Sequence, residues 1–123
     1  MIETVRLSEK ARNQLLTLKR HTGIENWNTL CRWAFIESLK DQKEPPNEQI
    51  PLDSSVEMSW RTFTGGNESI YLTLVLERAL KAGIELEPAS VNNYFRLHLH
   101  RGISLINSST QHITLAKLVN RAA

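Results

Sequence analysis

Residues 26–39 read NWNTLCRWAFIESL, and this segment predicts the helix around which the chain is organised. Its apolar residues recur at helical spacing and form one stripe, which comprises Trp27, Leu30, Cys31, Ala34 and Phe35. Trp33 and Ile36 are also apolar, but they lie off the stripe because each residue turns a helix by roughly 100°. A helix that is apolar on most of its circumference is covered on several sides. We therefore expect a central helix, with Trp33 and Ile36 at the interface of a homo-oligomer.

Helical patterns lie on both sides of this segment. Ser8 is a typical cap for a helix over residues 9–21, which ends at Gly23 and has the stripe Ala11, Leu15 and Leu18. A third helix is expected between the cap Asn67 and Gly83, with the stripe Leu72, Leu76, Ala79 and Leu80. A long fourth helix starts at Pro88 and carries Val91, Phe95, Leu99, Gly102 and Ile106. Residues 107–123 predict a loop followed by a short amphipathic tail.

The remaining segments predict extended backbone. Residues 4–7 alternate polar and apolar side chains, as a short strand does. Three prolines interrupt residues 41–55, which predicts a loop across the surface, and residues 56–64 are expected to be extended, with Trp60 holding them to the core. The expected fold is a mainly α, single-domain protein of about four helices over residues 1–106. Its short N-terminal strand resembles the start of a ribbon-helix-helix protein.

The overall composition of the chain excludes several classes of protein. The chain has 123 residues, a single cysteine and a formal net charge of +2. One cysteine forms no internal disulfide, and the sequence has neither an apolar run long enough to span a bilayer nor a secretory signal at its start. We therefore expect a cytoplasmic protein that does not enter a membrane.

The distribution of charge is more informative than its sum. Residues 1–40 carry seven Lys and Arg against four Asp and Glu, whereas residues 41–66 carry two against five. This asymmetry suggests contact with nucleic acid phosphates. The candidate DNA-binding residues are Arg6, Lys10, Arg12, Lys19 and Arg20, together with a second basic cluster of Arg96 and Arg101. The alternative is that these side chains form solvated helix faces and polar caps.

Residues with catalytic or metal-binding chemistry do not form a recognisable site. His98 and His100 diverge by about 200° on a helix, whereas helical zinc ligands are four residues apart. Cys31 belongs to the apolar stripe, where a thiol is unreactive. The glycines at 65 and 66 precede a helix, but the Lys-Ser or Lys-Thr of a nucleotide-binding loop is missing. We expect no enzyme, no metal and no cofactor.

Several motifs together resemble the DndE family. They are VRLSEKAR at residues 5–12, LKRHTGI at 18–24, LCRWAF at 30–35 and FRLHLHRGIS at 95–104, and the resemblance spans roughly residues 4–106. It implies a small helical accessory protein of bacterial DNA phosphorothioation, in which sulfur replaces a non-bridging phosphate oxygen. It also implies partners: a sulfurtransferase-like subunit, an ATPase-like subunit and a cysteine desulfurase. The implied role is non-catalytic binding of duplex DNA, nicked duplexes included, as an oligomer.

Two other functions are compatible with the residues. In a ribbon-helix-helix repressor or antitoxin, paired strands of two chains enter the major groove, and Thr4 and Arg6 would face the bases. In a scaffold that binds only the other subunits of the same machinery, the basic residues would be a solvated face. Salt dependence and sequence preference of DNA binding distinguish these alternatives.

Overall fold

The structure is a computed structural model that describes the backbone of residues 1–122 and the side chains of residues 1–110. Its elements are, in chain order, β1 (Thr4–Arg6), α1 (Glu9–Thr22), α2 (Trp27–Lys40), β2 (Glu57–Ser59), α3 (Trp60–Thr64), α4 (Glu68–Lys81) and α5 (Pro88–Ala122). The expected mainly α fold is confirmed. The short helix α3 is an addition to the four helices that the sequence predicts.

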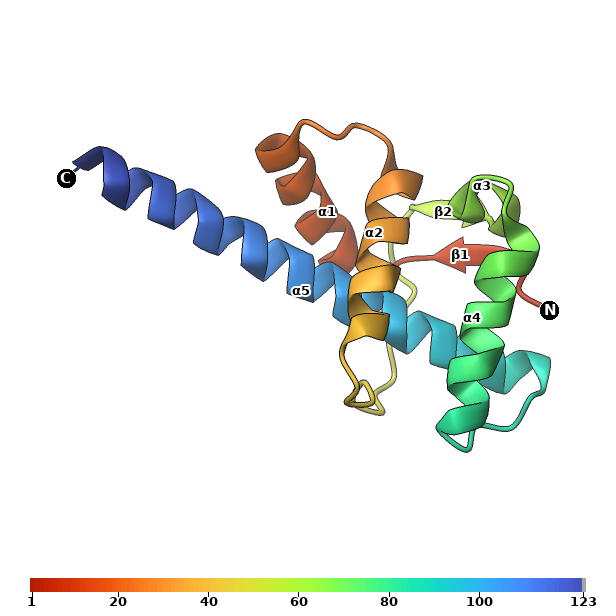
Figure 1. Cartoon of the computed structure of the whole chain (residues 1–123). Coiled ribbons are helices and arrows are strands. Elements are labelled where there is room, and N and C mark those ends of the chain that lie inside the picture. The colour runs from red at the N-terminus through yellow and green to blue at the C-terminus, as the bar shows by residue number, and fades with distance from the viewer. Residues whose placement is uncertain (123) are drawn as a thin grey trace.

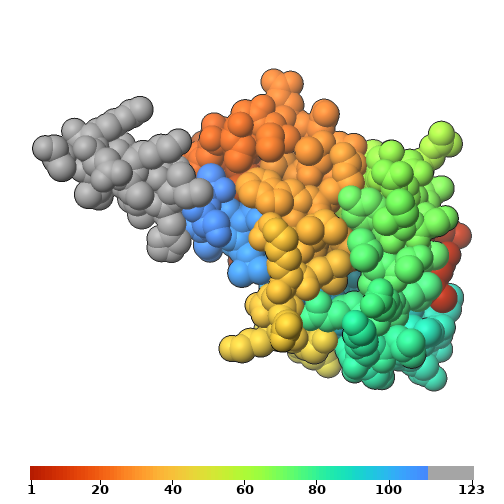
Figure 2. All heavy atoms as spheres, in the orientation of Figure 1, coloured from red at the N-terminus to blue at the C-terminus, as the bar shows by residue number. Residues whose placement is uncertain are grey.

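The long helix α5 is the axis of the molecule, and α1, α2 and α4 all pack against it (Figure 1). The closest approach is at Gly102 of α5, where a Cβ atom would lie 1.8 Å from the backbone oxygen of Ala34 in α2. Only glycine is compatible with this crossing, because the obstacle is backbone and not a flexible side chain. On one face of the molecule, α2 and α4 cover much of α5 (Figure 2).

Aromatic rings join the elements on one side of α5. The ring centroid of Phe95 in α5 lies 5.2 Å from that of Phe35 in α2, 5.1 Å from that of Phe63 and 5.2 Å from that of Trp60. Trp60 and Phe63 both come from α3, and both are buried. The expectation that Trp60 holds this segment to the core is therefore confirmed, although the segment itself is not extended throughout. The Ser59 hydroxyl accepts a hydrogen bond from the backbone N–H of Thr62 and starts α3.

The N-terminal strand is confirmed, and its partner lies in the same chain. β1 pairs with β2 in antiparallel register, with Val5 opposite Met58. One edge of β1 is therefore occupied by β2. A ribbon-helix-helix protein would instead require β1 to pair with a strand of a second chain. The side chain of Val5 is buried, and Thr4 and Arg6 on either side of it are exposed.

The ends of α1 follow the local sequence signals. Ser8 accepts a hydrogen bond from the backbone N–H of Ala11 at 3.1 Å, and Gly23 adopts a left-handed conformation with φ of 74°.

Two expectations further along the chain are wrong. Leu80 is 65% exposed and does not belong to the buried stripe of α4, which contains Val75 and Ala79. The loop expected from residue 107 is absent from the described backbone, because α5 continues without a break to Ala122. Ile103 and Ile106 are still packed in the core just before this point, so the helix is supported where the loop was expected. The packing of the apolar tail side chains lies outside the described residues.

Candidate nucleic-acid interface

Arg6 and Arg96 are ninety residues apart in the sequence but line the same crevice between β1 and α5. Successive side chains of β1 point to opposite faces, so Arg6 points outward next to the buried Val5. On α5, Arg96 lies beside the stripe of buried side chains. Thr4 and Asn92 line the crevice as well. Among the described residues, neither guanidinium has an ion pair or hydrogen bond, so both are available to an anion. One arginine from each basic cluster thus lines this crevice, a proximity that the sequence alone leaves undecided.

The other candidates on α1 are more engaged with neighbouring groups. Arg12 forms an ion pair with Glu9 at 3.1 Å, and both side chains remain partly exposed. The Lys19 ammonium lies 4.8 Å from the ring centroid of Trp27, a cation–π contact that connects α1 to the start of α2. Arg20 is exposed and donates only a long hydrogen bond of 3.4 Å to Thr17. Of these three side chains, Arg20 is the most available to a phosphate.

Lys10 and Arg101 line a different hollow, a groove of about 380 Å³ between α1, α5 and the proline-rich loop. Lys10 is exposed, whereas only 13% of the Arg101 side chain is accessible. The Arg101 guanidinium donates to the Ser38 hydroxyl at 2.9 Å and to the backbone oxygens of Ser38 and Lys43 at 2.7 and 2.5 Å. These contacts give Arg101 a structural role at the end of α2.

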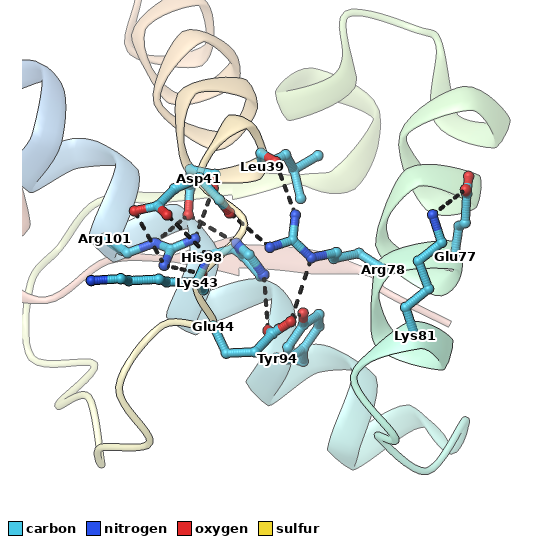
Figure 3. Close-up of polar contacts among 11 residues, drawn as sticks. Leu39, Asp41, Lys43, Glu44, Glu77, Arg78, Lys81, Tyr94, His98 and Arg101 are labelled. Carbon is cyan, nitrogen blue, oxygen red and sulfur yellow. Dashed lines mark hydrogen bonds and ion pairs between the residues drawn. The ribbon is translucent and has the colours of Figure 1, made fainter.

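A second arginine, Arg78 of α4, binds the same helix end from the other side (Figure 3). It donates to the backbone oxygens of Leu39 and Asp41 at 2.9 and 2.7 Å and lies 3.5 Å from a carboxylate oxygen of Glu44. The last four backbone oxygens of a helix lack partners within the helix, and cations are favoured there. Arg78 was not singled out from the sequence, because nothing local to α4 indicates that it reaches α2.

A comparison with protein families matches residues 4–114 to the family described as "DNA sulphur modification protein DndE". This match covers most of the 123 residues. The chain belongs to the DndE family. The family is involved in DNA phosphorothioation, so the resemblance seen in the sequence motifs is confirmed.

Two solved structures show the same fold. The crystal structure of DndE from Escherichia coli B7A, involved in DNA phosphorothioation modification, is 23% identical and has a TM-score of 0.73, and the match covers 86% of this chain and 98% of that one. A DndE G21/24K mutant structure is 18% identical with a TM-score of 0.68, covering 88% and 99%. At these identities the structures show the fold alone. The comparison with curated proteins found no match.

The two buried histidines of this DndE-family chain have structural partners. The Ser38 hydroxyl accepts from Arg101 at 2.9 Å and forms a second hydrogen bond of 2.8 Å with Nδ1 of His98. Burial, helped by Arg101 and Arg78, lowers the pKa of His98 to about 4. In His100, Nε2 accepts from the backbone N–H of Ser8 at 3.1 Å and Nδ1 donates to the backbone oxygen of Arg96 at 2.8 Å. Burial also lowers the pKa of His100.

The other residues that the sequence singled out lie on α2. Cys31 is fully buried, and burial raises the pKa of its thiol to about 12, which confirms that it is a core residue. Trp33 is 37% exposed and Ile36 is half-buried against the core, so both lie near the surface where the interface was expected. Among the described residues there is no cluster of three or more potential metal ligands and no helix long and apolar enough to cross a membrane.

Proposed function

We propose that this DndE-family chain is the non-catalytic DNA-binding subunit of a DNA phosphorothioation system. Family membership supports the process, and the crevice that unites Arg6 and Arg96 supports the contact with DNA. Two guanidiniums with no ion pair or hydrogen bond to the described residues offer several donors to phosphate oxygens, and arginine matches phosphate geometry through paired hydrogen bonds. Phosphate contacts position a protein on a duplex without reading its sequence.

The proposal has further parts, which concern the extent of the basic surface, the absence of catalysis and the partners. Arg20 is exposed on α1 and extends the basic surface beyond the crevice, with Arg12 and Lys19 available in part. The buried thiol of Cys31 has no access to a substrate, which supports a non-catalytic role. The sulfur chemistry then belongs to sulfurtransferase-like and ATPase-like partner subunits in the cytoplasm, with this chain acting as a homo-oligomer.

The test measures duplex binding of wild-type protein and the Arg6→Ala/Arg96→Ala double variant by fluorescence anisotropy at several salt concentrations. We expect weaker binding on every duplex sequence, and a slope of log K against log salt that is shallower by about 2. The control is Lys40→Ala/Lys81→Ala, which removes the same charge from two lysines that are ion-paired on the protein at 2.9 and 3.3 Å.

Each alternative gives a different result in the same measurement. A single preferred sequence would favour a repressor, and wild-type protein that binds no duplex, intact or nicked, would favour a scaffold that contacts only its protein partners. Equal slopes for the test and control variants would show that the crevice does not contact phosphate.

A further inference from the structure

The most acidic segment of the chain lies against the face that carries Lys10. Residues 41–56, which we call the acidic loop, connect α2 to β2 and contain four carboxylates and one lysine. The groove of about 380 Å³ has Lys10, His100 and Arg101 on its helical side and Glu48 and Asp53 on its loop side. A loop with this charge lowers the electrostatic attraction of the groove for any other anion.

One of these carboxylates occupies a position that suits a phosphate. The Oδ1 atom of Asp53 accepts a hydrogen bond of 2.8 Å from the backbone N–H of Glu9, in the first turn of α1. Backbone donors and the helix dipole make such a helix start attractive to anions, and a carboxylate already satisfies it here. Glu48 lines the same groove as Lys10, so one loop contributes acidic side chains both to this groove and to the start of α1.

The acidic loop is fastened at both ends, which keeps these carboxylates in place. At its start, Arg78 and Arg101 bind the backbone oxygens of Asp41 and Lys43. Near its end, the Ser54 hydroxyl donates to the backbone oxygen of Leu7 at 2.7 Å. The backbone N–H of Leu7 in turn donates to Val56 at 3.2 Å. The backbone next to Asp53 is therefore held, and its carboxylate has a defined partner in the backbone N–H of Glu9.

We propose that the acidic loop is an autoinhibitory element that competes with DNA phosphates for Lys10 and the start of α1. This inference rests on the proposed DNA-binding function and concerns its regulation. DNA binds at the crevice of Arg6 and Arg96, while Glu48 and Asp53 keep the adjacent groove from adding phosphate contacts. Anything that draws the loop away, including a partner subunit with a basic surface, increases the number of phosphates bound.

The test uses the full chain with Glu48→Gln and Asp53→Asn, which remove two charges while keeping an oxygen that accepts from Glu9. We expect duplex binding that is tighter by about fivefold at 0.1 M salt, with a salt slope steeper by about 1, because Lys10 gains a phosphate. The control Glu68→Gln/Glu85→Gln removes the same charge from the start of α4 and the turn after it, neither of which lines the groove, and should change affinity less than twofold.

A third substitution makes the result specific to the groove. Lys10→Ala should have little effect on wild-type binding but should abolish the gain in the Glu48→Gln/Asp53→Asn protein. The thermal midpoint of each variant shows whether the fold is kept. Equal effects of Lys10→Ala in both backgrounds, or equal gains in test and control variants, would overturn the autoinhibitory role while leaving DNA binding intact. Absence of DNA binding in wild type and variants alike would overturn both proposals.

Discussion

At the scale of single residues, Gly102 sets the distance between α2 and α5. Gly102→Ala would place a methyl group 1.8 Å from the Ala34 backbone oxygen, so the two helices would have to separate along their whole contact. We expect a loss of unfolding free energy of about 4 kcal/mol or more, measured by urea denaturation.

The exposed Ser108→Ala on the same helix is the matched control and should change this free energy by no more than about 0.5 kcal/mol. Ala34→Gly should not rescue Gly102→Ala, because the obstacle is the backbone oxygen. A rescue would contradict the proposed crossing geometry.

The buried histidines predict how stability depends on pH. Folding lowers the pKa of His98 to about 4 from an unfolded value of 6.5 and lowers that of His100, so the unfolded chain binds more protons as the pH falls. Their contribution is complete above about pH 6.5 and is lost progressively as the pH decreases toward 4. For His98 alone we expect a loss of about 2 kcal/mol between pH 8 and pH 5.

Urea denaturation across this pH range measures the effect. His98→Gln should flatten the pH dependence, whereas His21→Gln at the exposed end of α1 should leave it unchanged. A His98→Gln protein with the full pH dependence would contradict the assignment to this buried imidazole.

At the scale of elements, the end of α2 depends on arginines from two other helices. Arg101→Ala would leave the backbone oxygens of Ser38 and Lys43 without their donor. We expect it to lower the unfolding free energy by about 2–3 kcal/mol while leaving the salt slope of DNA binding unchanged. The opposite pattern is expected for Arg96→Ala, whose guanidinium has no protein partner among the described residues. Parallel denaturation and DNA-binding measurements separate the two arginines, which the sequence places in one cluster.

At the scale of the whole molecule, the outer face of α2 predicts self-association. Trp33 is 37% exposed on a helix whose opposite side is already buried, so its indole leaves apolar area for a second copy. Trp33→Lys should reduce the oligomer to a monomer at micromolar concentration, as measured by light scattering. Leu80→Lys alters an even more exposed apolar side chain on α4 and should leave the assembly unchanged. A monomeric wild-type protein would contradict the expected interface.

The sequence by itself determined most of the helix boundaries and the character of their faces. Ser8, Gly23 and Pro88 act through hydrogen bonds or fixed dihedral angles within a few residues, so their effects are visible locally. The buried stripes of α1 and α2 are likewise a consequence of helical periodicity. This periodicity also places Cys31 in the core. The family motifs indicate the process, DNA phosphorothioation.

Only the tertiary structure decided which distant groups meet. Arg6 and Arg96 line one crevice, and Arg101 binds the end of α2. The strand β1 pairs with β2. The tertiary structure also placed Glu48 and Asp53 of the acidic loop in the groove that Lys10 lines, with Asp53 bound to the backbone N–H of Glu9. These outcomes depend on the close crossing of α2 and α5 at Gly102 and on which helix ends face each other. Contacts between residues that are tens of positions apart leave no periodic or capping signal in either segment, because their geometry is fixed only when the helices pack.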